Sequence, residues 1–152
     1  MPDIPFMRAH GHVPGPTQRP LLAGLFDGAL ASIPALALLW FSGTVEAVHN
    51  SLGMTGRLVL VLQVLELVLA GLFYGRIFGR AANDREGGWL FGISYGFVVW
   101  MLGPAIILQW ILGQTVAVGR PAMVLCLAHL LYGLMLGILF PGLHSFLHRK
   151  LD

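Results

Sequence analysis

Residues 123–137 read MVLCLAHLLYGLMLG, an apolar run that contains one histidine and two glycines. His129, Gly133 and Gly137 follow one another at intervals of four, so a helix places them on one face. With its flanks the run covers residues 121–143, about 23 residues, which is enough to cross a bilayer core of ~30 Å at 1.5 Å per residue. Because glycines and a hydrogen-bonding side chain favour helix–helix contact, we expect this helix to face protein rather than lipid.

The composition of the whole chain indicates an integral membrane protein. Hydrophobic residues make up 57% of the 152 residues and charged residues only 11%, whereas soluble domains carry roughly 25% charged residues. The basic pI of about 9.1 has a topological explanation, because the Lys and Arg residues lie at the ends of apolar segments. We therefore expect a lipid bilayer as the environment and no nucleic-acid partner.

Four apolar segments are each long enough for one crossing, which predicts an all-α fold. They cover residues 21–42, 58–79, 89–112 and 121–143. The proline-rich residues 1–20 predict an irregular arm, and residues 144–152 predict a basic tail. Arginine and lysine lie mainly on the side of the two termini: Arg8, Arg19, Arg76, Arg80, Arg85, Arg149 and Lys150, against Arg57 and Arg120. Since positive residues favour the cytoplasm, we expect both termini there.

The two halves of the chain look like copies of one helical hairpin. The aligned positions are 22–28 with 90–96, Pro34 with Pro104, Trp40 with Trp110, Gly43 with Gly113, and Gly71 and Gly75 with Gly133 and Gly137. Each half contains two crossings, so both copies enter the membrane in the same direction and form a parallel repeat. We predict a pseudo-twofold four-helix bundle, with kinks at Pro34 and Pro104.

Small residues recur at intervals of four along every segment. The glycines that we expect at helix crossings are Gly24, Gly28, Gly71, Gly75, Gly79, Gly92, Gly96, Gly133 and Gly137. Such faces let two backbones approach closely. Because a single four-helix bundle has little need of so many small faces, we expect some of them to bind helices of partner subunits.

Polar side chains inside membrane spans are costly, and each deserves a functional hypothesis. Glu66 and His129 each lie eight residues into a helix that starts at the outer surface, so both lie roughly 12 Å below it at 1.5 Å per residue. We predict a hydrogen-bonded tie between the second and fourth helices, extended by Gln63. A proton relay or ion site is one alternative, and packing without mutual contact is another.

Asp27 lies inside the cytoplasmic end of the first helix, at the repeat position that Tyr95 occupies in the third. We expect a polar cluster in which Asp27 forms an ion pair with Arg76 or a hydrogen bond with the Tyr95 hydroxyl. Contact with a substrate or a lipid headgroup is the alternative.

The chain carries no sequence motif for catalysis, such as a phosphate-binding glycine loop, a nucleophile elbow or a paired acid site. Only His129 lies well inside a span, whereas a bis-imidazole haem needs two such histidines. The cytoplasmic histidines lack a carboxylate or Cys at metal-like spacing; they are His10, His12, His144 and His148. We therefore expect no enzyme, no cofactor and no metal, and the single Cys126 allows no internal disulfide.

The second half also carries a family resemblance. The segments GWLFGISYG at 88–96 and AHLLYG at 128–133, together with Trp100, Pro104 and Gly137, resemble the YagU-like group of small bacterial four-span membrane proteins. The resemblance covers about half of the chain, and the first half departs from it because its second helix ends without a histidine. It implies a four-span fold in the bacterial inner membrane and no particular activity.

The function predicted from these features is that of an accessory or scaffolding subunit in a larger membrane complex, such as an energy-transducing one. The soluble parts are too small to form an active site, and the glycine faces favour partner helices. The alternative is a small homo-oligomeric transporter or channel that uses Glu66 and His129.

Overall fold

The computed structural model describes residues 19–82, 87–111, 113 and 119–148, with the backbone alone at 80–82 and 148. Within these ranges every regular element is helical. Four helices are long and apolar enough to cross a membrane: Pro20–Phe41, Gly56–Gly79, Gly88–Ile111 and Arg120–Leu147. The predicted all-α, multi-pass membrane fold is therefore confirmed, while most of the predicted arm, residues 1–18, lies outside the described residues.

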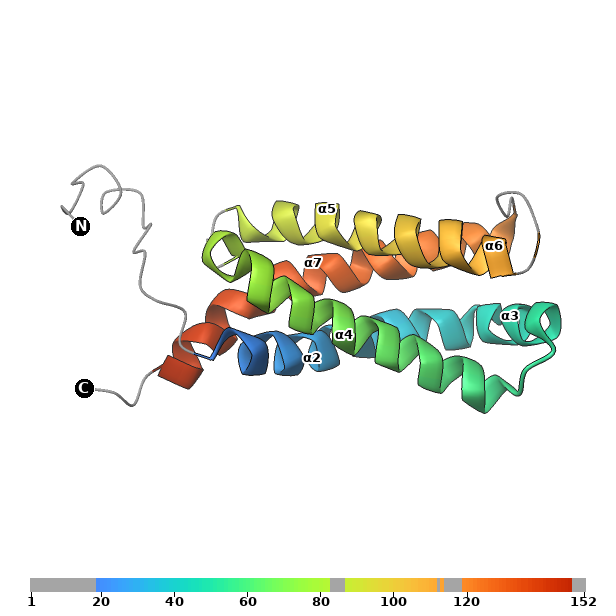
Figure 1. Ribbon diagram of the computed structural model, residues 1–152, viewed down its shortest axis with the longest axis horizontal. Coiled ribbons are helices and arrows are strands. Elements are labelled where there is room, and N and C mark those ends of the chain that lie inside the picture. Colours follow the sequence, from blue (N-terminus) through green and yellow to red (C-terminus); the bar gives the residue numbers. More distant parts are fainter. Residues whose placement is uncertain (1–18, 83–86, 112, 114–118, 149–152) are drawn as a thin grey trace.

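The elements follow one another as α2 (Pro20–Phe41), α3 (Thr44–Leu52), α4 (Gly56–Ala82), α5 (Gly88–Trp100), the π-helix η1 (Met101–Leu108), α6 (Gln109–Ile111) and α7 (Arg120–His148). The spanning helices run side by side along the long axis of the molecule, with α3 at one end (Figure 1). Two elements differ from the prediction. A short helix, α3, lies in the expected connection, and α7 continues through Pro141 to His148, so part of the predicted tail is helical.

Glycines on both sides of α3 turn the chain from α2 into α4. Gly43 and Gly53 have φ angles of 73° and 65°, values that L side chains rarely adopt. Between them α3 is amphipathic, with Thr44 and Val45 buried against the bundle and Glu46 exposed. The apolar side of α3 therefore covers one end of the bundle.

The bundle consists of two closely packed helix pairs. α4 packs on α2 and α5 packs on α7, while α2 and α7 join the two pairs, and far fewer contacts connect α4 with α5. The core includes the fully buried side chains of Tyr74, Tyr132 and Phe140. The ring centroid of Tyr74 lies 5.0 Å from that of Tyr95 and 5.6 Å from that of Phe140, so aromatic side chains of α4, α5 and α7 pack together between these helices.

Each helix pair crosses at glycines. Gly24 and Gly28 of α2 lie against Gly71 and Gly75 of α4, and Gly92 and Gly96 of α5 lie against Gly133 and Gly137 of α7. Such contacts require the absence of a side chain. A Cβ added at Gly28 would lie 2.9 Å from the Gly71 Cα, closer than real Cβ atoms approach. Gly79 is buried in α4.

These crossings correct one expectation from the sequence. Eight of the nine glycines that we expected at helix contacts meet another glycine of the same chain. Glycine faces let two backbones approach, and here the approaching backbone belongs to the chain itself. The glycines therefore give no indication of partner helices.

Candidate ligand-binding site

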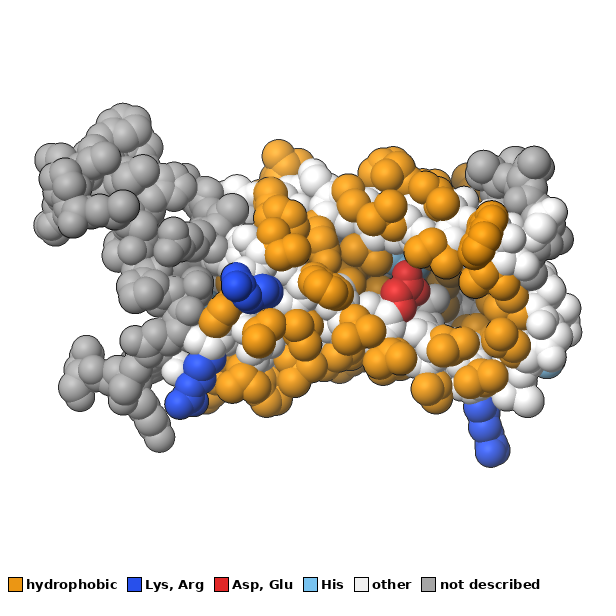
Figure 2. Space-filling view, in the orientation of Figure 1, with side chains coloured by type: hydrophobic (Ala, Val, Ile, Leu, Met, Phe, Trp, Pro, Cys, Tyr) orange, Lys and Arg blue, Asp and Glu red, His pale blue; other side chains and the backbone are white. Residues whose placement is uncertain are grey.

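A cavity of about 300 Å³ opens between α3, α4 and η1. Its wall is mostly apolar, and Gln63 and Glu66 supply its polar side chains. Leu62 and Ile107 line the cavity and are about half exposed. The cavity therefore opens at the surface of the bundle between apolar side chains. Figure 2 shows an acidic side chain in a hollow with hydrophobic side chains around it.

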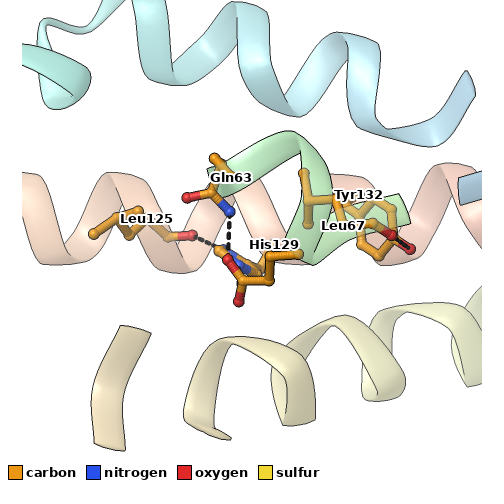
Figure 3. A network of polar contacts seen from close by, with 6 residues as sticks. Gln63, Leu67, Leu125, His129 and Tyr132 are labelled. Carbon is orange, nitrogen blue, oxygen red and sulfur yellow. Dashed lines mark hydrogen bonds and ion pairs between the residues drawn. The ribbon is translucent and has the colours of Figure 1, made fainter. Parts of the chain in front are cut away.

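Glu66 of α4 projects from the cavity toward His129 of α7. The distance from Glu66 Oε1 to His129 Nε2 is 3.7 Å, and the Gln63 amide nitrogen donates to Glu66 Oε2 at 2.7 Å. Figure 3 shows this network. The His129 side chain is 1% exposed, whereas that of Glu66 is 31% exposed. Gln63, Glu66 and His129 lie together, and Gln63 extends the contact as predicted, but the hydrogen bond predicted between Glu66 and His129 is not formed, because their nearest atoms are 3.7 Å apart and Nε2 has no hydrogen-bond partner among the described residues.

The backbone determines which nitrogen of His129 carries a proton. Nδ1 lies 2.8 Å from the Leu125 carbonyl oxygen, and because a carbonyl only accepts, we assign the proton to Nδ1. Nε2 is buried without a hydrogen-bond partner among the described residues. In the neutral ring Nε2 therefore presents a lone pair to Glu66, and in the imidazolium form it presents a second N–H. With the Glu66 carboxylate ionised, the pair carries one negative charge in the first case and no net charge in the second.

The π-helical segment η1 shapes the opposite wall of the cavity. Gly103 lies directly against Glu66, because a Cβ at that position would overlap Glu66 Oε1. The next residue, Pro104, has no N–H to give to the helix. π-Helical turns are rare and are often found at functional sites. The two prolines expected to act alike do not, since α2 continues as an α-helix through Pro34 while Pro104 lies in η1.

Two tyrosine hydroxyls bind the backbone of α4 next to this site. The Tyr132 hydroxyl donates to the Leu67 carbonyl and the Tyr95 hydroxyl to the Ala70 carbonyl, each at 2.7 Å. Both bonds hold helices of the second half against α4. Tyr132 was not among the predicted site residues, although its position three residues after His129 places both on one side of α7.

The predicted cluster of Asp27, Arg76 and Tyr95 does not form. Asp27 is fully buried, and neither of its carboxylate oxygens has a hydrogen-bond partner among the described residues. Arg76 is exposed, and the Tyr95 hydroxyl binds the Ala70 carbonyl. The physical reason is helix rotation. Position 76 lies two residues from the buried Tyr74 and therefore points to another side of α4.

A second buried polar group, the Tyr74 hydroxyl of α4, also lacks a hydrogen-bond partner among the described residues. A buried carboxylate without a donor or a cation is costly. Asp27 of α2 and Tyr74 of α4 are therefore two buried polar side chains without hydrogen-bond partners among the described residues.

The histidines expected on the cytoplasmic side are only partly described. His10 and His12 lie outside the described residues, and His148 is described by its backbone alone. The His144 ring stacks on Phe140, with centroids 6.2 Å apart. Within the described ranges no group of three or more His, Cys, Asp or Glu side chains is placed to hold a metal ion.

Comparison with known proteins gave no relative for this chain. No family model, no curated protein and no solved structure matches it. The resemblance to YagU-like proteins therefore stays a prediction.

Proposed function

We propose that this protein binds an amphiphilic molecule from the bilayer, with the polar head of the molecule at Glu66 and its apolar part along Leu62 and Ile107. The observation that supports the proposal is a partly exposed carboxylate in an otherwise apolar cavity that opens at the surface of the bundle between apolar side chains. A carboxylate within a membrane span is costly and usually functional. A purely structural tie between helices has no need of a cavity beside it.

The size and lining of the cavity agree with this function. Small-molecule sites are typically apolar clefts of about 300–1,000 Å³ with a few convergent polar groups. Here the polar groups are Gln63 and Glu66, with His129 behind them. The proposal develops the small-transporter alternative of the sequence analysis, since binding is the first step of transport, and it needs no catalytic residue.

The accessory-subunit function ranks second. Its main argument was a surplus of glycine faces, and eight of these glycines are used inside the bundle.

Photolabelling tests the proposed binding. The protein is reconstituted in lipid nanodiscs with a diazirine-bearing dodecyl probe, irradiated and mapped by mass spectrometry. We expect labels on cavity residues such as Leu52, Leu62 and Ile107. Leu62→Trp should reduce this labelling several-fold because the indole fills the cavity. Leu69→Trp is the matched control, since Leu69 is equally exposed on α4 but does not line the cavity. Uniform labelling of all lipid-facing positions would refute the proposal.

We further infer that the chain is a parallel repeat of two helical hairpins in a bacterial inner membrane, with both ends cytoplasmic. Matching crossings support the repeat, because Gly24 and Gly28 contact α4 as Gly92 and Gly96 contact α7. The distribution of Lys and Arg along the sequence supports the orientation.

The orientation predicts which loops react from outside the cell. Ser51 of α3 and Ser145 of α7 are both exposed, and a cysteine can replace each in a Cys126→Ser background. With intact cells and a membrane-impermeant maleimide, we expect Ser51→Cys to be labelled and Ser145→Cys to be labelled only after lysis. The reverse pattern would show that the orientation is inverted.

A further inference from the structure

The polar atoms of the cavity are mainly hydrogen-bond acceptors. One N–H of Gln63 is used on Glu66, and the Nδ1 proton of His129 is used on the Leu125 carbonyl. What remains is the Glu66 carboxylate, the Gln63 amide oxygen and, behind them, the unpartnered Nε2 of His129. Apart from the second N–H of Gln63, the site offers no donor while His129 is neutral.

The charges around the cavity also favour a ligand that is positively charged and donates hydrogen bonds. Among the described residues no Lys or Arg side chain lines the cavity. Arg57 and Arg120 are exposed at the outer ends of their helices. The only countercharge near Glu66 in the described ranges is an imidazolium at His129, 3.7 Å away. When His129 is neutral, the carboxylate therefore needs a cation from elsewhere.

We propose that the ligand is a lipophilic organic cation with N–H donors, such as a protonated long-chain amine, and that it competes with a proton for the Glu66–His129 pair. The proposal rests on the proposed binding function and names its ligand class. The exchange balances in charge: an ammonium enters beside the Glu66 carboxylate, and one proton leaves the pair for the solvent. The apolar wall formed by Leu52, Leu62 and Ile107 surrounds the alkyl part.

Other amphiphiles satisfy this site less well. The carboxylate of a fatty acid is repelled by the Glu66 carboxylate and has no hydrogen-bond donor for it. An alcohol donates one hydrogen bond but supplies no charge, and a quaternary ammonium supplies the charge but no N–H. A primary ammonium supplies both, and charge-assisted hydrogen bonds are about twice as strong as neutral ones.

A competition assay with four head groups on one dodecyl chain tests the ligand class. Dodecylamine, dodecanol, dodecyltrimethylammonium and dodecanoate each compete with the photoprobe in zwitterionic nanodiscs, and empty nanodiscs correct for partitioning into lipid. We expect dodecylamine to compete at least about tenfold better than dodecanol and dodecanoate to be the weakest. Dodecyltrimethylammonium should fall between dodecylamine and dodecanol.

Two variants assign this preference to Glu66. Glu66→Gln should bring dodecylamine down to the level of dodecanol, and Glu66→Asp should retain much of the preference because the charge remains. Glu46→Gln is the matched control, since Glu46 is an exposed acid on α3 outside the cavity. Circular dichroism and size-exclusion profiles of each variant confirm that it is folded.

Proton exchange provides a second readout. In weakly buffered medium, dodecylamine binding should release protons from the wild type and not from Glu66→Gln. Its affinity should fall as the pH falls, because a proton then occupies the pair. Other titratable groups on the helices around it include Asp27 of α2, Glu46 and His49 of α3, Tyr74 of α4, Tyr95 of α5, and Cys126 and Tyr132 of α7. Because the exchange is assigned to the Glu66–His129 pair, Asp27→Asn should leave the pH dependence unchanged.

The outcomes separate the two proposals. If no dodecyl compound displaces the photoprobe, the binding function itself is refuted. If dodecanol or dodecanoate competes as well as dodecylamine, the cavity binds amphiphiles but the cation inference is overturned. Amine preference that survives in folded Glu66→Gln would also overturn it.

Discussion

Gly133→Leu is expected to lower the free energy of unfolding of the bundle by about 2–3 kcal/mol, the upper part of the usual cost of overpacking. A Cβ at this position would lie 2.9 Å from the Gly96 Cα and even closer to the Gly92 carbonyl oxygen. Both neighbours are backbone atoms of α5, so no side-chain rotation can relieve the overlap. α5 would have to move away from α7, and the crossing would be lost.

Gly142→Leu is the matched control for this substitution. Gly142 lies on the same helix, but a Cβ there meets no atom within 4 Å. Unfolding of the detergent-solubilised protein by sodium dodecyl sulfate, followed by circular dichroism, measures both variants. We expect Gly71→Leu, in the other crossing, to resemble Gly133→Leu. If Gly133→Leu and Gly142→Leu were equally stable, the close crossing of α5 and α7 would be contradicted.

Asp27→Asn is expected to have the opposite sign and, at alkaline pH where the carboxyl group is ionised, to stabilise the protein by about 1–2 kcal/mol, because a buried charge without a partner costs more than a neutral amide. Asp27 is fully buried, and neither of its carboxylate oxygens has a hydrogen-bond partner among the described residues. An asparagine has nearly the same shape and carries no charge at any pH. The same unfolding assay measures the gain.

Glu46→Gln makes the same chemical change at an acid that is exposed on α3, where we expect almost no effect. A loss of stability in Asp27→Asn would contradict the prediction. It would indicate that the carboxylate binds a cation or an ordered polar partner in the membrane. The sign of the change in the free energy of unfolding therefore decides whether Asp27 destabilises the bundle or belongs to a second binding site.

Much of the candidate site follows from counting along the sequence. Glu66 and His129 were predicted to meet because each lies eight residues into a helix that enters from the same side, and depth in a straight helix is proportional to residue number. Gln63 followed from its position one turn away. The same counting failed for Asp27, because equal depth does not bring two side chains together when the helices are rotated apart, as Arg76 shows.

Other features have weak signals in the sequence. α3 is only nine residues long, and short amphipathic segments resemble loops in composition. Pro34 and Pro104 are equivalent in the sequence alignment of the two halves, yet only Pro104 lies in a π-helix. Since Gly103 lies against Glu66 of α4, the environment of this segment includes another helix, which no local pattern reports.

The number and approximate positions of the four spans were readable from the chain alone, although not the continuation of α7 to His148, because the length of an apolar segment decides whether it crosses a bilayer. The positions of the glycine faces and the depth of the intramembrane acid were readable for similar reasons. Which helices pack against each other was not readable from the chain alone. Lipid tails are as apolar as leucine side chains, so no hydrophobic preference selects which helix faces meet, and close packing and a few polar contacts decide it instead. Only the tertiary structure could therefore reveal that the glycines pair within the chain and that α3, α4 and η1 enclose a cavity beside Glu66.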